Sequence, residues 1–387
     1  MRGDRSGLIE DRLQQSRRAV YLRSLTGLML IIRPAHAEIL HSPSGDRWQA
    51  EILSHPVALE ILRLAAGEAI EQGELVVKAC QGRSALLPTA SGIVDALVRA
   101  GLLVAVEVPA AASEAGQEDH DSARQWASAG WGSAFEYHRY TTGLRLLDYG
   151  SADTARIDQE LMASYLASAP PPELYLDRPG ELLDLPPPQP TRTATTVAEL
   201  YAEDLASKPR STDLEGLSDY CFLCFGQTGR VNFPVTGRQL LKSVPSGGSR
   251  HPTEAYLFVL DVAGVPRGTY HYSVRDHALE RVDPDDPEKI ALERCLVHAE
   301  RLAFGPALVA VLTSRPERSM YRYREARSYR VLHLDAGHVL YNAAMVARSF
   351  GWSSYRAYSP EEHGVEPVLK VNGITEFTIG TIAVGMP

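Results

Sequence analysis

A cluster of prolines constrains what the middle of this chain can form. Eight of the 25 prolines lie between residues 170 and 190. Proline has no backbone N–H and a fixed φ, so this stretch can be neither a helix nor a central strand of a sheet. Such a run is stiff and extended. We therefore expect it to wrap a surface and to lead the chain into a following domain.

Composition predicts a folded protein with more than one domain. The chain has 387 residues, of which 44% are hydrophobic and 22% charged, and this length corresponds to roughly two to three domains. Its net charge is −9, which argues against nucleic-acid binding because phosphate contacts need a basic face. The apolar run at residues 28–32 is far shorter than the about 20 residues of a membrane span.

The number of cysteines and the first residues of the chain indicate the cellular compartment of the protein. The chain has four cysteines, and its first 18 residues contain charged side chains but no apolar signal segment. A cytoplasmic protein with reduced thiols is the expectation. Cys221 and Cys224 have CxxC spacing without a second pair nearby, so we expect buried structural thiols and no metal site. His251, His271 and His338 are expected to be core or capping histidines.

The first predicted domain covers residues 1–110. Its expected elements are strands at residues 27–32 and 37–40, helices from residue 55 and at 89–100, and a strand at 102–106. This order predicts a small winged-helix-like domain. The second helix has no cluster of basic residues, so a docking or dimer-supporting role is favoured over DNA binding, and a peptide-gripping role is the remaining alternative.

Residues 111–194 are predicted to be a linker with helices and the proline-rich wrap, and residues 195–387 a second domain. The expected elements of that domain are helices at residues 198–207, 218–225, 288–303 and 334–350, and strands at 254–260, 268–272, 307–313 and 376–384. Helices and strands mix there without regular alternation. The predicted fold class is therefore α+β.

The strongest chemical motif combines adjacent glycines with hydroxyls and positive charge. It contains Pro245, Ser246, Gly247, Gly248, Ser249 and Arg250, and Lys242 comes just before it. Adjacent glycines let the backbone approach a ligand closely. The hydroxyls and cations suit a phosphate or the edge of a flavin ring. Neither GxxxxGK[ST] nor GxGxxG is present, and an ordinary tight turn is the alternative.

A second motif concentrates arginine and tyrosine. Residues 320–330 hold four arginines and three tyrosines, which is unusual in an acidic protein. Guanidinium and aromatic groups together suit an anionic or π-rich ligand, and a tyrosine beside cationic groups can act as a base. The alternative is a solvated face of alternating charge.

These motifs occur in an order that resembles a known family. From about residue 130 the chain resembles the SagB-type dehydrogenases, a branch of the FMN-dependent nitroreductase superfamily. The resemblance is carried by residues 242–252, Glu254-Ala255-Tyr256, residues 268–272, Arg322-Tyr323, residues 327–330 and residues 334–338.

The resemblance implies a nitroreductase-like domain that binds FMN across a homodimer interface. It implies oxidation of thiazoline or oxazoline rings to azoles in a ribosomally made, post-translationally modified peptide, with a cyclodehydratase as a further partner. Arg210 and Ser211 are assigned to the FMN phosphate, with Lys242 and Arg250 as helpers. The turn from Ser246 to Ser249 is expected to meet the flavin ring or the ribityl chain.

The expected catalytic pair is Arg322 and Tyr323. Azoline dehydrogenases commonly have Lys-Tyr at this place. Arginine stays protonated, so Tyr323 is the expected base, with Arg322 assisting it or orienting the peptide. The alternatives are FMN-dependent oxidation of another peptide or small-molecule bond, and a non-catalytic scaffold in a peptide-modifying complex.

Overall fold

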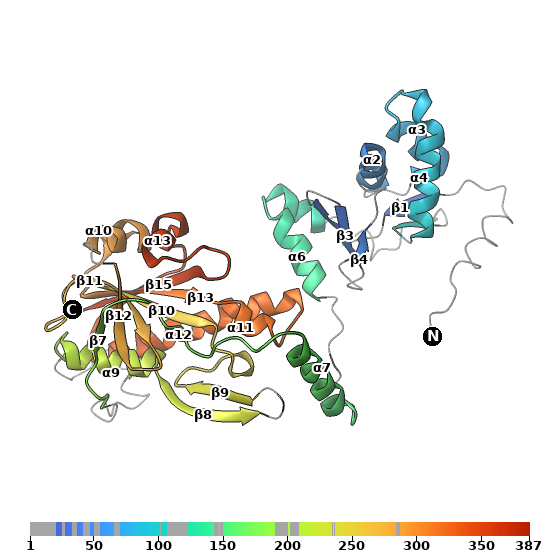
Figure 1. Ribbon diagram of the computed structural model, residues 1–387. Helices are drawn as coiled ribbons and strands as arrows, with labels where there is room; N and C mark the ends of the chain where they lie inside the picture. The colour runs from blue at the N-terminus through green and yellow to red at the C-terminus, as the bar shows by residue number, and fades with distance from the viewer. Residues whose placement is uncertain are drawn as a thin grey trace. The chain divides into compact units, whose positions relative to one another are not determined.

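The chain separates into two compact units, Met1–Leu147 and Asp148–Pro387 (Figure 1). The computed structural model describes residues 21–24, 28–32, 37–41, 47–49, 55–65, 70–100, 102–106, 122–142, 147, 150–189, 200–201, 209–233, 235, 237–283, 287–296 and 298–387. The predicted domain boundaries, at residues 110 and 194, lie outside these ranges and stay predictions. Each unit is described by itself.

The first unit contains two small antiparallel sheets and a group of helices. The sheets have the orders β5-β1-β6 and β2-β3-β4. Their strands are β1 (Tyr21–Ser24), β2 (Leu28–Ile32), β3 (Ala37–His41), β4 (Arg47–Gln49), β5 (Ile70–Glu71) and β6 (Leu103–Val106). The helices are α2 (Pro56–Ala65), α3 (Gln72–Ala79), α4 (Leu87–Arg99) and α6 (Gly132–Thr142).

The core of this unit forms where α2, α3 and α4 pack together. Ile61, Leu75, Leu97 and Leu102 are fully buried there. The predicted helices and the predicted hairpin are present, and α3 is an element that the sequence analysis did not expect. The winged-helix-like assignment stays a prediction. The start of the predicted linker segment, residues 111–121, lies outside the described residues.

The second unit is built on an antiparallel sheet with the strand order β14-β15-β13-β10-β11-β12-β7. Its strands are β7 (Leu182–Asp184), β10 (Thr253–Val259), β11 (Gly268–Ser273), β12 (Ala278–Asp283), β13 (Leu308–Ser314), β14 (Ser353–Ala357) and β15 (Phe377–Gly385). The mixture of helices with an antiparallel sheet confirms the α+β class.

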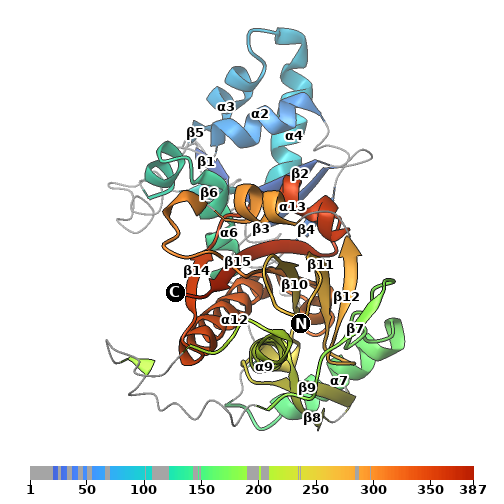
Figure 2. The ribbon, with the colours of Figure 1, turned by 90° about the vertical axis from the view of Figure 1, so that its left-hand side faces the viewer.

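Helices cover both faces of this sheet (Figure 2). Ala255, Leu257 and Val259 pack with α9 (Leu214–Phe225) and α12 (Tyr329–Ser349) on one face. Tyr256 and Phe258 pack on the other face, where α10 (Glu288–Ile290) and α13 (Glu362–Leu369) lie. A strand that is buried on both faces is mostly apolar, which explains the apolar runs at residues 255–259 of β10 and 308–312 of β13.

The proline stretch runs along one edge of the sheet, as predicted. Its only sheet element within the described residues is β7, which pairs with the edge strand β12. Beyond β7 the Leu185 N–H donates to the His277 carbonyl at 3.3 Å, and Ser218 Oγ of α9 donates to the Pro186 carbonyl at 2.6 Å. Pro190 lies outside the described residues.

The predicted helix at residues 288–303 is present only over its first half. A helical start, α10, passes into a π turn at Ala291–Cys295, and a short 3-10 turn follows at Ala299–Arg301. Leu296 is extended and buried in the core, and the Cys295 carbonyl accepts a hydrogen bond from Thr381 Oγ1 at 2.7 Å. From Cys295 onward, contacts with the rest of the domain therefore replace the hydrogen bonds of a continued helix.

Several element boundaries also differ from the predictions. α9 begins at Leu214, four residues earlier than expected, because Asp213 caps it by accepting the Gly216 N–H at 2.8 Å. α12 begins at Tyr329. The hairpin of β8 (Gln227–Phe233) and β9 (Gly237–Lys242) and the helix α7 (Thr154–Ser168) were not predicted as such. Most of the predicted helix at residues 198–207 lies outside the described residues.

Within the described residues, no helix combines the length and the apolar character needed to cross a membrane.

Candidate functional site

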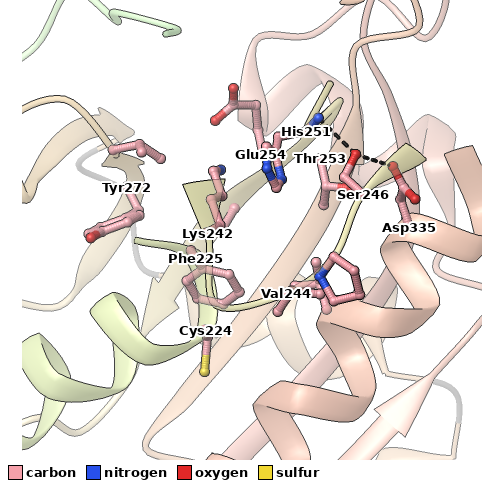
Figure 3. Close-up of a pocket in the computed structure, with 14 residues that line it drawn as sticks. Cys224, Phe225, Lys242, Val244, Ser246, His251, Thr253, Glu254, Tyr272 and Asp335 are labelled. Carbon is pink, nitrogen blue, oxygen red and sulfur yellow. Dashed lines mark hydrogen bonds between the residues drawn. The ribbon is translucent and has the colours of Figure 1, made fainter. Parts of the chain in front are cut away.

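A pocket lies where the end of α9 faces the starts of β10 and α12 (Figure 3). Three of the predicted site residues, Lys242, Pro245 and Ser246, line it. The other lining residues are Cys224, Phe225, Val244, His251, Thr253, Glu254, Ala255, Tyr272, Val274, Asp335 and Val339. The wall of the pocket therefore combines apolar side chains with an equal number of polar or charged ones.

Asp335 of α12 anchors the glycine turn. Ser246 Oγ donates to Asp335 Oδ2 at 2.5 Å, and the Gly247 N–H donates to Asp335 Oδ1 at 3.2 Å. The His251 N–H donates in turn to Ser246 Oγ at 2.9 Å (Figure 3). Burial raises the pKa of Asp335, although the bonds from Ser246 and Gly247 oppose that shift. The sequence analysis named Asp335 only as part of a motif.

The backbone of the turn is held in an uncommon conformation. Gly248, Ser249 and His251 have φ values of 62°, 56° and 44°. Left-handed backbone costs energy for residues other than glycine, and it persists where the surroundings determine it. The bonds from Ser246 and Gly247 to Asp335 provide that support.

The turn lies directly against Tyr323. A Cβ added at Gly248 would lie 2.2 Å from Tyr323 Oη, and one at Gly247 would lie 2.7 Å from Val331 Cγ1. Arg250 also interacts with the Tyr323 hydroxyl, which partly offsets the lowering of the Arg250 pKa by burial. The structure thus brings together the two motifs that the sequence singled out.

Arg322 and its neighbours attach α7 to this region. Arg322 Nη2 lies 2.5 Å from Asp158 Oδ1, and Arg322 Cζ lies 5.1 Å from the centre of the Tyr323 ring. Arg324 stacks over the Tyr165 ring at 3.8 Å. Part of the arginine-tyrosine motif is therefore structural. The catalytic role of Arg322 and Tyr323 stays a prediction.

A buried charge network lies beside the pocket, and its centre is Glu254. This residue is 3% exposed, and its carboxylate lies 2.5 Å from Arg318 Nη1 and 3.1 Å from His271 Nε2. His271 Nδ1 lies 2.7 Å from Glu280 Oε2. Burial opposes the ionisation of Glu254, but Arg318, His271 and Lys242 outweigh that effect and hold its pKa below the usual range. His271 is a core histidine, as predicted.

Lys242 is a pocket residue with an unusual acidity. Burial lowers its pKa to about 8, and Arg318 adds to the shift while Glu254 opposes it. Its ammonium group is therefore only partly protonated in mildly alkaline solution. A cation that is poorly solvated in this way gains much from an anionic ligand.

Arg210 and Ser211 lie away from this pocket. They precede α9, whose 12 residues span about 18 Å, whereas the pocket lies at the other end of that helix. Arg210 Nη2 lies 2.9 Å from Asp219 Oδ2, and its Cζ lies 4.2 Å from the centre of the Phe350 ring. A single chain does not bring these two residues together with Lys242 and Ser246, and their assignment to a phosphate stays a prediction.

Hydrogen-bond donors without partners are found near the glycine turn and before the start of α9. Arg250 Nε and Thr253 Oγ1 near the turn, and Arg210 Nη1 before α9, are buried and have no hydrogen-bond partner among the described residues. Buried donors without partners are uncommon in folded proteins and often indicate a missing ligand or water. Cationic and hydroxyl donors are the groups that a phosphate ester with a polyol chain requires.

The contact between Gly248 and Tyr323 can be tested by adding a methyl group. Gly248→Ala and Gly237→Ala both place alanine at a positive φ, 62° and 70°, but only the Cβ at position 248 meets other atoms. Both should lose about 1 kcal/mol of unfolding free energy to strain, and Gly248→Ala about 1–3 kcal/mol more to overpacking. Denaturant unfolding measures both losses. Adding Tyr323→Phe to Gly248→Ala should recover part of the extra loss. Equal losses in the two alanine variants would contradict this contact.

The lowered pKa of Lys242 predicts a specific pH dependence. Between pH 8 and 10.5 the unfolded chain still binds the Lys242 proton while the folded chain has released it. The unfolding free energy of the wild type should therefore rise through this window relative to that of Lys242→Met. Denaturant unfolding of both proteins across the window tests this expectation, and parallel stability curves would show that the Lys242 pKa is normal.

Comparison with known proteins places this site in a family. Residues 235–386 match the family model described as Nitroreductase family. The trifolitoxin-processing protein TfxB of Rhizobium leguminosarum bv. trifolii is 32% identical over 261 residues, which cover 65% of this chain and 69% of TfxB. A protein described as a nitroreductase, MJ1384 of Methanocaldococcus jannaschii, is 28% identical over 184 residues, which cover 45% of this chain and 87% of that protein.

A solved structure from Anabaena variabilis, described as a nitroreductase, is 22% identical, with a TM-score of 0.44 over 59% of this chain and 45% of its own. The family match includes the glycine turn and the arginine-tyrosine motif, and the identity to TfxB extends over two thirds of that relative. The resemblance noted from the motifs is confirmed at this level: the chain belongs to the nitroreductase family.

Proposed function

We propose that this protein is an FMN-dependent dehydrogenase that oxidises thiazoline or oxazoline rings to azoles in a ribosomally made peptide. The observation that carries the proposal is the contact between the Tyr323 hydroxyl and the Gly248 backbone, because it joins a candidate base to a turn suited to a flavin. Membership of the nitroreductase family supports a flavin-dependent redox reaction. The relative named for processing trifolitoxin supports a peptide-modifying role.

The residues that would hold FMN fall into two groups. Lys242 and Arg250 offer positive charge beside the turn, and the turn itself would meet the flavin ring or the ribityl chain. Arg210 and Ser211 would bind the phosphate at the start of α9. The length of α9, about 18 Å for its 12 residues, separates the groups within one chain. We therefore propose that a second copy completes the site, which makes the protein a homodimer.

FMN, when bound, supplies an acceptor for the hydride that leaves one carbon of the azoline ring. Tyr323 would remove the proton from the neighbouring carbon, so that the two steps together take two hydrogen atoms from the ring. Arg250, which interacts with the Tyr323 hydroxyl, would stabilise the phenolate that accepts this proton.

Arg322 does not act as the base but positions Tyr323. Its guanidinium is paired with Asp158 and lies over the Tyr323 ring. These contacts make it a positioning residue that fixes the orientation of Tyr323. A cyclodehydratase that makes the azoline rings is the partner that this reaction would require.

Replacement of the tyrosine hydroxyl tests the proposal. Tyr323→Phe should bind FMN normally but oxidise a synthetic azoline peptide about 10²- to 10⁴-fold more slowly, the usual contribution of a general base. Tyr329→Phe is the matched control, because this tyrosine of the same motif is exposed. Mass spectrometry detects the loss of two hydrogen atoms from the peptide.

Two outcomes would contradict the proposal. Full activity in Tyr323→Phe would exclude this residue as the base. An FMN-loaded wild type that oxidises another peptide or small-molecule bond but leaves azoline rings intact would exclude the azoline substrate.

A further inference from the structure

A second pocket, of about 460 Å³, lies between the proline stretch and the β8–β9 hairpin. Its described lining includes three arginines, Arg238, Arg250 and Arg318, and one acidic residue, Glu173. Leu166, Pro172 and Leu174 are among its apolar lining residues. The pocket thus combines an excess of positive charge with an apolar wall.

Arg318 lines this pocket, and one of its buried donors is unpaired. The residue is 5% exposed. Its Nη1 pairs with Glu254 at 2.5 Å and donates to the His251 carbonyl at 2.9 Å, and its Nε donates to the Glu173 carbonyl at 3.1 Å. Its Nη2 is buried and has no partner among the described residues. A buried N–H of a charged group is costly to leave unpaired, so this atom indicates a missing acceptor.

The charge of Arg318 is only partly neutralised. Glu254, its buried partner, is shared with His271 and Lys242. Arg250 Nε also lacks a partner. Arg238 is an exposed residue of β9 that lines the same pocket. These three guanidinium groups favour an acceptor with negative charge and two oxygen atoms, since guanidinium and carboxylate match in a bidentate geometry.

This second pocket adjoins the site described above through two residues. Arg250 lines it and interacts with the Tyr323 hydroxyl. Arg318 lines it and pairs with Glu254, which lines the pocket at the turn. A group that binds Arg250 in this pocket therefore shares that residue with the Tyr323 hydroxyl.

We propose that this pocket binds a carboxylate of the peptide substrate and so selects which ring is presented to Tyr323. Arg318 and Arg250 hold the carboxylate, Arg238 stands at the rim, and the apolar wall receives the adjoining methylene groups. The inference rests on the proposed function, because it assigns the substrate of that same site.

The test uses the full chain loaded with FMN and four synthetic azoline peptides. Two carry a glutamate or a glutamine near the ring, and two end in a free carboxylate or an amide. Arg238→Gln removes a rim charge from an exposed residue and leaves the buried network intact. Arg230→Gln is the matched control, because Arg230 belongs to the same hairpin but does not line the pocket and bonds instead to Tyr175.

The proposal predicts that Arg238→Gln raises KM about tenfold for the carboxylate peptide, which corresponds to the loss of one charge-assisted hydrogen bond. The kcat value and the KM for the matching neutral peptide should stay unchanged, and Arg230→Gln should behave as the wild type. If KM differs only between the glutamate and glutamine peptides, the bound carboxylate is a side chain. If KM differs only between the free-carboxylate and amide peptides, the bound carboxylate is the C-terminus.

Equal KM values for acidic and neutral peptides, or equal effects of Arg238→Gln and Arg230→Gln, would overturn the proposal.

Binding of the fluorescein-labelled glutamate peptide without an azoline ring, measured by anisotropy, separates this inference from the proposed function. Binding that depends on Arg238 in a protein that oxidises no azoline would uphold the pocket and refute the proposed function. Competition between FMN and this peptide would assign the pocket to the cofactor phosphate and refute the inference.

Discussion

The hydrogen bonds from the glycine turn to Asp335 are the interaction on which the candidate site depends. Ser246 and Gly247 both donate to this buried carboxylate, and the turn is thereby joined to α12, the longest helix among the described residues. The left-handed backbone of Ser249 would be costly without such support. Because the turn is fixed, the Tyr323 hydroxyl can approach the backbone of Gly248 where no Cβ stands between them.

Positive charge near this turn is organised by two buried acids. Glu254 interacts with Arg318, His271 and Lys242, and Glu280 pairs with His271. Excess positive charge lies on both sides of the Arg318–Glu254 ion pair. Lys242 contributes it at the turn, and Arg250 and Arg238 contribute it in the second pocket. An acidic chain with a net charge of −9 therefore contains a local region suited to anions.

Local signals in the sequence predicted the motifs, and long-range contacts decided how they meet. The glycine pair predicted the turn because few residues other than glycine adopt a left-handed backbone conformation. The apolar runs predicted β10 and β13. The pairing of Glu254 with Arg318 escaped notice because it joins residues 64 positions apart in the chain. The helix predicted at residues 288–303 is present only over its first half because burial of Leu296 and the bond to the Cys295 carbonyl prevailed over local helical preference. The pairing of Arg322 with Asp158 was equally invisible, since α7 was not predicted.

The central claim is that the glycine turn and Tyr323 belong to a flavin site. Its most direct test is a visible absorbance spectrum of the purified protein, followed by release of the cofactor and its identification by mass. We expect a flavin spectrum and FMN in equal number to the chains. A colourless protein that also fails to bind added FMN would contradict it, and would leave the glycine turn with a purely structural role.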